Sequence, residues 1–200
     1  MEEFGSKQVQ NAQKGRMLAF VTQDVPEEAC SGLSASSRGR VDKYNPNRTV
    51  AEEGRQITDQ RGVNATSSKF SHPPALCPVP AQVARETLWW KQRYPGIDVL
   101  YAKGDVKSAF KIFYVKEADC FLFVIEVPGE NFGLPGKTIT IVSLVLTFGW
   151  VGSPGEYAIF AWGAKQYHQS FRPSKPEWHT WIAFHNNFLV DDEALIEPLL

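Results

Sequence analysis

Short apolar runs bounded by turn residues recur along this chain from residue 55 onward, and such runs predict β-strands. "RQITDQRGVN" alternates as a half-buried strand does before it enters a turn, and "IDVLYAKGD" predicts a strand that ends at Asp105. "IFYVKEADCFLFVIEV" predicts a hairpin about the polar turn "KEAD", and "TITIVSLVLTFG" predicts a further strand. Near the end, "WIAFHNNFLV" and "ALIE" flank Asp191 and Asp192, which predicts a hairpin with this Asp pair at its tip.

Two segments carry the start and stop signals of helices. The first, "AQVARETLWWKQRY", follows Pro80 and stops before the dipeptide "PG". In the second, Ser153 can cap the helix and Pro154 suits its first position, so we predict a helix over residues 154–171. Its apolar content predicts a largely buried helix and includes Tyr157, Ile159, Phe160 and Trp162.

Residues 1–47 are rich in Ser, Gly, Gln, Glu and Arg, and the patch "MLAFV" is the one stretch there with much to bury. Such a composition predicts a flexible lead-in, because few apolar side chains offset the entropy of ordering the chain. Residues 48–200 then form the folded part. Strands and helices in this mixture predict an α+β fold.

The overall composition is that of a globular protein, with 43% hydrophobic residues and a formal net charge of -1. A net charge near zero gives no global electrostatic argument for nucleic-acid binding, so any such argument depends on local clusters. Three widely spaced cysteines and a polar, acidic start predict an intracellular protein, cytoplasmic or nuclear and not secreted. The longest apolar run, residues 139–151, is too short to cross a bilayer, so no membrane partner is expected.

Three carboxylates give the chain its candidate chemistry: Asp105, Asp191 and Asp192. Hard Mg²⁺ ions take oxygen ligands, and a pair of them stabilises the attacking and leaving oxygens of phosphoryl transfer. Adjacent aspartates are also ordinary turn formers, so the pair alone says little. Strands on both sides of the pair strengthen the metal-site interpretation.

Four segments together resemble the fingers and palm of reverse transcriptases of the retroviral and retrotransposon type. "RQITDQRGVN" resembles the fingers motif R-x-x-x-D-x-R-x-x-N, and the matching positions are Arg55, Asp59, Arg61 and Asn64. "DVKSAF" resembles the first palm motif, "LTFGWVGSPG" resembles the second, and "LVDD" resembles the aromatic-x-Asp-Asp of the third. The four occur in the family's order over residues 48–200.

The resemblance implies a polymerase palm with an antiparallel sheet and packed helices, plus part of the fingers. It implies RNA-directed DNA polymerase activity on a primed RNA or DNA template, with dNTP as the second substrate. Two Mg²⁺ ions, with Mn²⁺ as a possible substitute, would be held by Asp105, Asp191 and Asp192 and by the Val106 carbonyl oxygen. No protein nucleophile is required, and the oligomeric state stays open.

The resemblance also implies substrate-binding roles. Arg55 would bind the triphosphate in a bidentate manner, and Arg48 would add charge. Phe110 would lie beneath the sugar as a steric gate against a 2′-hydroxyl, although a Phe after a strand is more often a core residue. Gly149 would let the backbone approach template and nucleotide closely. Asp59, Arg61 and Asn64 would fix the fingers.

The sequence departs from the family pattern at Leu189, where the aromatic residue is expected, and at Thr147, where the family has Pro. It also stops eight residues after Asp192, before any thumb, so we expect weak, salt-sensitive nucleic-acid binding and little or no primer extension. Two alternatives stay open. One is an inactive retroelement remnant that binds nucleic acid or protein, and the other is a metal-dependent nuclease, which leaves Phe110 and Arg55 without a role.

Overall fold

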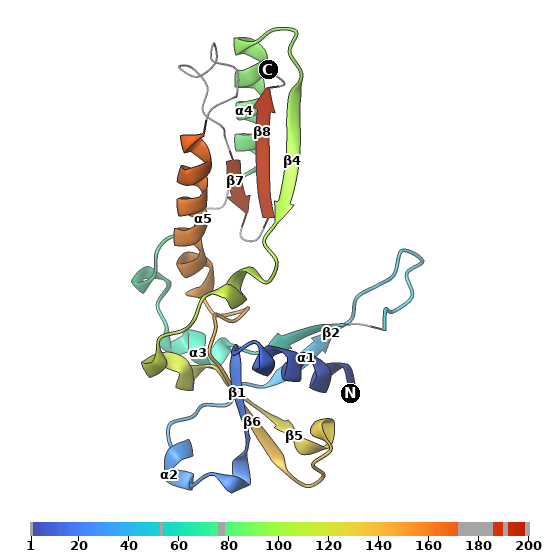
Figure 1. Cartoon of the computed structure of the whole chain (residues 1–200), viewed down its shortest axis with the longest axis vertical. Coiled ribbons are helices and arrows are strands. Elements are labelled where there is room, and N and C mark those ends of the chain that lie inside the picture. The colour runs from blue at the N-terminus through green and yellow to red at the C-terminus, as the bar shows by residue number, and fades with distance from the viewer. Residues whose placement is uncertain (1, 53, 76–78, 172–185, 190–191, 199–200) are drawn as a thin grey trace. The chain divides into compact units, whose positions relative to one another are not determined.

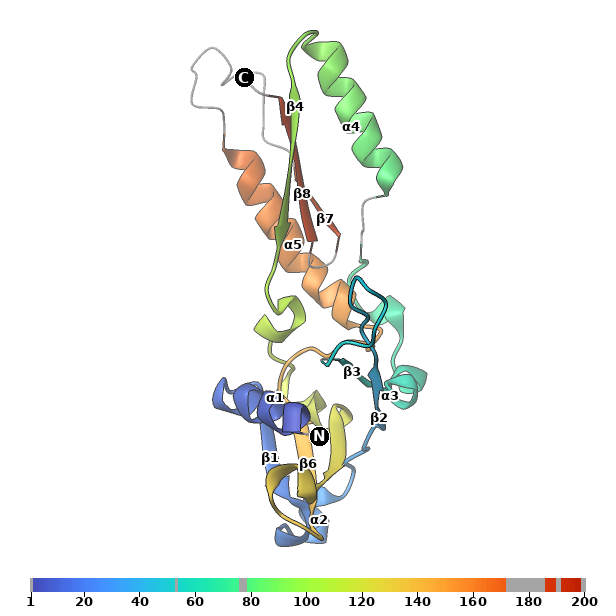
Figure 2. The same ribbon diagram turned by 90° about the vertical axis from the view of Figure 1, so that its right-hand side faces the viewer.

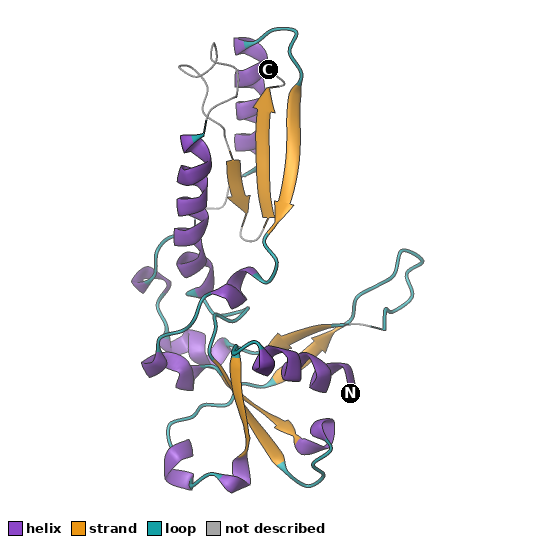
Figure 3. Ribbon diagram, viewed as in Figure 1, coloured by secondary structure: helices purple, strands orange, loops and turns teal. Residues whose placement is uncertain are grey.

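The computed structural model describes residues 2–52, 54–75, 79–171, 186–189 and 192–198. The protein has a mixed α+β fold of helices and antiparallel sheets (Figures 1 and 3). The chain divides into two units, and each unit is built from two separate stretches of the sequence. Unit 1 comprises Met1–Ser68 and Phe110–Ser153, and unit 2 comprises Lys69–Ala109 and Pro154–Leu200.

A three-stranded antiparallel sheet forms the centre of unit 1. Its strands are β1 (Met17–Val21), β6 (Thr138–Ser143) and β5 (Val124–Pro128), in the order β1-β6-β5. Alternate residues of β5 and β6 point to one side, because successive side chains of a strand lie on opposite faces. The resulting core cluster contains Ile125, Val127, Ile139 and Ile141, with Met17, Val21 and Phe132 packed against it.

The prediction that residues 1–47 form a flexible lead-in is wrong. Helix α1 (Glu2–Gln13) is followed by β1, which pairs with β6 from Met17 opposite Ser143 to Val21 opposite Ile139. The five-residue patch "MLAFV" suffices because β6 satisfies its backbone and the core cluster buries two of its side chains. The expected boundary between residues 47 and 48 is wrong for the same reason, since unit 1 includes residues on both sides of it.

The rest of unit 1 surrounds this sheet with short elements. Strands β2 (Arg38–Val41) and β3 (Arg55–Thr58) form a two-stranded antiparallel hairpin, and α3 (Arg61–Thr66) follows β3 directly. The predicted strand of "RQITDQRGVN" is confirmed over Arg55–Thr58, whereas α3 takes the place of most of the predicted turn. The remaining short helices along the chain are α2 (Glu27–Cys30), η1 (Thr22–Asp24), η2 (Lys69–Ser71), η3 (Ala109–Ile112), η4 (Glu117–Leu122) and η5 (Gly129–Phe132).

The hairpin predicted over residues 112–127 is wrong. The polar "KEAD" stretch belongs to residues 116–119, most of which lie in η4, and β5 begins only after that helix. The first half of the segment finds a distant partner instead: Val115 N–H donates to the Leu144 carbonyl at 2.8 Å, and Leu146 N–H donates to the Phe113 carbonyl at 3.0 Å. A non-local pairing therefore takes the backbone groups that the local hairpin would have used.

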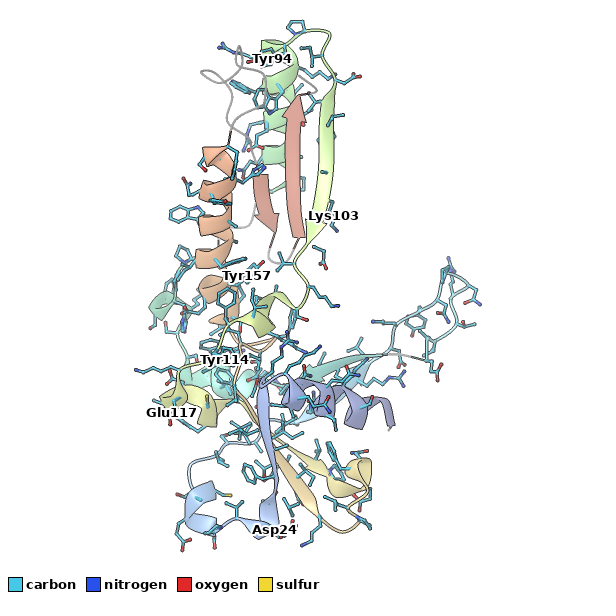
Figure 4. All side chains as sticks on the ribbon, viewed as in Figure 1. Asp24, Tyr94, Lys103, Tyr114, Glu117 and Tyr157 are labelled. Carbon is cyan, nitrogen blue, oxygen red and sulfur yellow. The ribbon has the colours of Figure 1, made fainter. Side chains whose placement is uncertain are left out.

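Unit 2 contains a second three-stranded antiparallel sheet. Strands β4 (Val99–Asp105), β8 (Asp192–Pro198) and β7 (Asn186–Leu189) lie in the order β4-β8-β7. Helix α4 (Pro80–Arg93) covers one face of it (Figure 2). Trp90 and Ile196, which are 1% and 0% exposed, form the core beneath the helix, and Tyr94 stacks on Trp90 near the helix end (Figure 4). The predicted helix after Pro80 and the predicted strand ending at Asp105 are both confirmed.

Helix α5 (Ser153–Ser170) occupies the predicted segment, but the prediction that it is largely buried is wrong. Tyr157 is 1% exposed and Ala161, one turn later, is 8% exposed. Ile159 and Trp162 lie on other faces of the helix and are 59% and 62% exposed. The apolar residues are distributed around the helix, so a single packed face buries only some of them.

The pairing of β1 with β6 predicts that the N-terminal segment resists hydrogen exchange. Backbone N–H groups of Met17–Val21 that face β6 should exchange at least about tenfold more slowly than in an unfolded chain, because exchange requires the sheet to open. Mass spectrometry or NMR of the whole chain in deuterated buffer measures this. Exchange of all five amides at unfolded-chain rates would contradict the pairing.

Candidate active site at the end of a three-stranded sheet

The register of β4 with β8 places Asp105 opposite Asp192. The two strands pair antiparallel over seven residues, from Val99 opposite Pro198 to Asp105 opposite Asp192. Directly opposite residues of an antiparallel ladder have Cα atoms about 4.5–5.5 Å apart. Two aspartates that are distant in the sequence are therefore neighbours at one end of this sheet.

Strand β7 completes this end of the sheet. It pairs antiparallel with β8, and its last residue, Leu189, lies opposite Asp192. The strands predicted on either side of the Asp pair are confirmed over Asn186–Leu189 and Asp192–Pro198, and residues 181–185 of the first prediction lie outside the described residues. Asp191 lies outside the described residues, and of Asp192 the structure describes the backbone position.

The segment after β4 turns sharply. The Val106 carbonyl, a predicted metal ligand, accepts a hydrogen bond from Ala109 N–H at 3.1 Å, and Ser108 has a positive φ of 62°. A carbonyl oxygen has two lone pairs, so the Val106 oxygen retains one. The Asp105 side chain is exposed at the strand end. Among the described side chains, no three of His, Cys, Asp and Glu form a metal-binding group.

In unit 1, the side chain of Asn64 connects the fingers-like motif to the second palm-like motif. Asn64 Nδ2 donates to the Gly149 carbonyl at 2.8 Å, and Asn64 Oδ1 accepts from Val151 N–H at 2.9 Å. Trp150, between them, donates from Nε1 to Ser67 Oγ at 3.1 Å. One amide thus uses both its donor and its acceptor on a single loop, and we call these contacts the Asn64 clasp.

Gly149 has a conformation that suits glycine. Its φ is +95°, which side chains with a Cβ rarely adopt. A Cβ at this position would also lie 3.4 Å from Gln60 Cγ, and Gln60 is itself buried. The Asn64 clasp and this backbone conformation together fix the course of the loop.

Asp59 and Arg61 form a local ion pair in front of α3. Arg61 Nε donates to Asp59 Oδ1 at 2.9 Å, Arg61 Nη2 donates to Oδ2 at 2.6 Å, and the Arg61 backbone N–H also donates to Oδ1. These hydrogen bonds lower the pKa of Asp59 from 3.8 to about 2. Asp59 therefore stays ionised at neutral pH and positions the start of α3.

The other predicted substrate-binding residues also belong to unit 1. Arg48 lies at the turn between β2 and β3 with a positive φ of 64°, and Arg55 is the first residue of β3. Phe110 is only 3% exposed, and its ring centroid lies 4.7 Å from that of Phe148. Phe110 therefore has a packing role, and the gate assignment stays a prediction.

The "SPG" segment is held by the protein's own backbone. Ser153 Oγ donates to the Thr147 carbonyl at 2.6 Å. A Cβ on Gly155 would collide with the Pro73 carbonyl oxygen, so this glycine accommodates a nearby chain segment. His72 Nδ1 lies 2.8 Å from Glu156 Oε1 in the first turn of α5. The close approach of the Pro73 backbone therefore explains why a glycine suits position 155.

Comparisons with known proteins add no family assignment: no protein-family model matches the chain, and no curated protein matches it. None of the helices within the described residues combines the length and apolar composition needed to cross a bilayer. The functional argument therefore depends on the sequence motifs and on the geometry above.

Sequence reasoning missed a group of cations around Lys111 in unit 1. The residues that place positive charge near its ammonium group are Arg16, Arg38, Lys14 and Lys7. Lys7 and Lys14 are seven residues apart, a spacing that puts two residues on the same face of a helix. This spacing could have indicated a basic helix face. The sequence analysis expected a flexible lead-in here, and in a flexible segment the spacing has no structural consequence.

The Asn64 clasp predicts a measurable cost of substitution. Asn64→Ala removes two hydrogen bonds and leaves the Gly149 carbonyl and Val151 N–H without them, so it should lower the free energy of unfolding by about 1–3 kcal/mol. Asn131→Ala, which loses one long and exposed hydrogen bond of 3.3 Å, is the matched control and should change it by less than about 0.5 kcal/mol. Urea unfolding of both variants measures the difference, and equal midpoints would contradict a structural role of the clasp.

Proposed function

We propose that this chain is the fingers and palm part of an RNA-directed DNA polymerase of a retroelement. The observation that supports this most directly is the β4–β8 register, in which Asp105 lies opposite Asp192. The first and third palm-like motifs are then adjacent, as a shared metal site requires. Two aspartates that are distant in the sequence thus occupy opposite positions at one end of a ladder.

The chemistry of these residues fits Mg²⁺. Asp105, Asp191, Asp192 and the Val106 carbonyl offer oxygen donors, which hard divalent cations prefer over nitrogen or sulfur. Opposite residues of an antiparallel ladder share one face of the sheet, which suits donors to a common ion. When bound there, Mg²⁺ would supply charge neutralisation and activation of the primer 3′-hydroxyl.

The proposed reaction is nucleotidyl transfer. The primer 3′-oxygen forms a bond to the α-phosphorus of a dNTP, the bond between the α-phosphorus and its bridging oxygen to the β-phosphate breaks, and pyrophosphate leaves. The hydroxyl proton passes to solvent. In this proposal Arg55 and Arg48 bind the triphosphate, because guanidinium groups match phosphate oxygens in charge and geometry.

The Asn64 clasp has a positioning role in the proposed polymerase. It fixes the loop around Gly149, where an exposed backbone with no side chain allows template and nucleotide to approach. Both hydrogen bonds of the Asn64 side chain go to backbone groups of this loop, so its contribution would act through loop geometry.

A second candidate function is nucleic-acid binding without catalysis, by a retroelement remnant. Leu189 stands where the resembled motif has an aromatic residue. The cations around Lys111 would support binding whether or not the carboxylates hold metal. A measurement of metal binding at Asp105 distinguishes the polymerase from the non-catalytic binding protein, because only the polymerase requires the metal.

We predict that Asp105→Asn weakens metal binding and abolishes nucleotide incorporation. Mn²⁺ binding is measured by electron paramagnetic resonance, and single-nucleotide primer extension is measured with protein in excess over primer. The wild-type chain should bind Mn²⁺ and extend slowly; the variant should bind at least about tenfold more weakly and extend at least about 100-fold more slowly.

Asp98→Asn is the matched control, since Asp98 precedes β4 at its other end and forms a long ion pair of 3.9 Å with Lys91. It should leave both measurements unchanged. A wild-type chain that binds oligonucleotide but neither binds Mn²⁺ nor extends a primer would favour the non-catalytic candidate.

Phe110→Ala tests the steric gate. If the ring lies beneath the sugar, its removal should shift the ratio of specificity constants for dNTP over rNTP by at least about tenfold toward the ribonucleotide. Because Phe110 is buried, the substitution should also cost about 3–5 kcal/mol of stability, so melting is measured beside nucleotide competition.

Phe148→Ala is the control for this experiment. It removes the same ring contact from the other side, and Phe148 is 63% exposed, so it should change stability less and sugar selectivity not at all. A folded Phe110→Ala protein with unchanged selectivity would leave Phe110 with packing as its only role.

A further inference from the structure

The loop between β2 and β3 ends in a tight turn that is bonded internally. Figure 1 shows that this loop extends beyond the ends of the two strands. Tyr44 and Val50 form an antiparallel bridge, and Ala51 N–H donates to the Lys43 carbonyl at 2.8 Å. The loop thus contains a short hairpin of its own, and we call residues 43–51 the tip hairpin.

The turn of the tip hairpin has three residues, Pro46, Asn47 and Arg48. Arg48 N–H donates to the Asn45 carbonyl at 2.8 Å, and Asn45 N–H donates to the Thr49 carbonyl at 2.8 Å. The φ of Arg48 is 64°, in the left-handed region. This pattern is that of a type I turn followed by a left-handed residue, a common three-residue hairpin connection. Pro46 suits the second position of such a turn, because its fixed φ matches the angle needed there.

Arginine is an unfavourable residue at position 48. Glycine is the usual residue at the left-handed position of this turn, because a Cβ there lies too close to the backbone. Among the described residues, Arg48 shares a positive φ without being glycine only with Ser108, which follows Asp105 in the candidate active site. Strained residues of this kind concentrate at ligand-binding and active sites. Arg48 is exposed, so burial of its side chain does not offset the strain.

Thr49 connects the polar side chains that hold this turn. Its Oγ1 donates to Asn47 Oδ1 at 2.6 Å and accepts from Asn45 Nδ2 at 3.1 Å. Asn47 Oδ1 also accepts from the Thr49 N–H at 3.2 Å. These three side chains thus bond the residues on both sides of Arg48 to one another. A strained conformation persists where the surrounding contacts over-determine it, and this network supplies such contacts.

Arg40 fixes the base of the tip hairpin. Its Nη2 donates to the Glu52 carbonyl at 2.8 Å and to the Ala51 carbonyl at 3.3 Å. Its Nε lies 3.7 Å from Asp42 Oδ1. The hairpin that carries Arg48 is therefore attached to β2 by side-chain bonds as well as by the main chain.

We propose that the side chains of Asn45, Asn47 and Thr49 are positioning residues of the polymerase. They hold Arg48 in the left-handed conformation from which its guanidinium group meets the triphosphate of the incoming nucleotide. The inference rests on the proposed function, and it gives a role to three side chains that lie outside the sequence motifs. A bidentate contact requires the guanidinium plane to match the phosphate oxygens, so it depends on the backbone that carries the side chain.

Thr49→Val and Thr49→Ser form the test pair. Valine keeps the shape and strand preference of threonine but has no hydroxyl, whereas serine keeps the hydroxyl that links Asn45 and Asn47. Binding of inorganic tripolyphosphate to the isotope-labelled whole chain is followed in EDTA by the NMR shifts of the Arg48 and Thr49 amides. Thr49→Val should bind at least about fivefold more weakly because it loses two hydrogen bonds, and Thr49→Ser should stay within about twofold of the wild type.

Two further measurements separate positioning from a general effect on the fold. In single-nucleotide primer extension, Thr49→Val should raise the KM for dNTP about fivefold and change kcat less than about twofold, since the carboxylates are untouched. In an Arg48→Ala background, Thr49→Val should cause no additional loss of tripolyphosphate affinity. A positioning residue acts through the residue that it holds, so the two losses are not additive.

Arg48→Gly tests whether turn stability is given up for binding. Glycine adopts the left-handed conformation without strain, so hydrogen exchange of the Asn45 amide, which closes the turn, should become at least about twofold slower. The same variant should lose tripolyphosphate affinity at least about fivefold. Lys43→Gln, which removes one positive charge from the same hairpin outside the turn, is the matched control and should change both quantities less than about twofold.

Four results would overturn the inference: no response of the wild-type Arg48 amide to tripolyphosphate, equal affinities of the wild type and Thr49→Val, additive losses in the Arg48→Ala background, or faster exchange in Arg48→Gly. The last result would mean that the arginine side chain stabilises the turn. Failure of the polymerase proposal looks different, since a chain without Mn²⁺ binding or primer extension would still lose tripolyphosphate affinity in Thr49→Val.

Discussion

The candidate site depends on the hydrogen-bond register between β4 and β8. A slip of one residue would move Asp105 from its place opposite Asp192 and exchange the faces of every side chain on the strand. The buried contact of Ile196 with Trp90 opposes such a slip, because it would bring a glutamate or leucine position beneath α4. Packing on one face of the sheet thus determines the position of carboxylates at its end.

A second constraint operates inside unit 1, where distant segments are joined by short polar contacts. Asn64 holds the loop at Gly149 and Val151, and Leu144 N–H is bonded to the Arg16 carbonyl. Each contact satisfies backbone groups that lie outside regular sheets. The fingers-like and palm-like motifs are therefore structural partners, whatever chemistry they support.

Local signals predicted the elements that carry their own start and stop residues. Helix α4 after Pro80, helix α5 at Ser153 and the strand ending at Asp105 all follow from such signals. Elements whose partners are remote were not predictable in this way. The patch at Met17–Val21 is ordered by its pairing with β6, and the segment before η4 forms hydrogen bonds with residues 144–146. The residues next to each segment in the sequence therefore do not determine its structure.

The order of strands in unit 2 has a consequence for synthesis of the chain. Strand β8 is central in the sheet, yet it follows β4 in the sequence with residues 106–191 between them. At about 5–20 residues per second, β4 leaves the ribosome roughly ten seconds before its neighbour exists. During that interval its edge is unpaired and available to other chains. The carboxylate pair is thus assembled late, after an interval in which the edge of β4 is open to other strands.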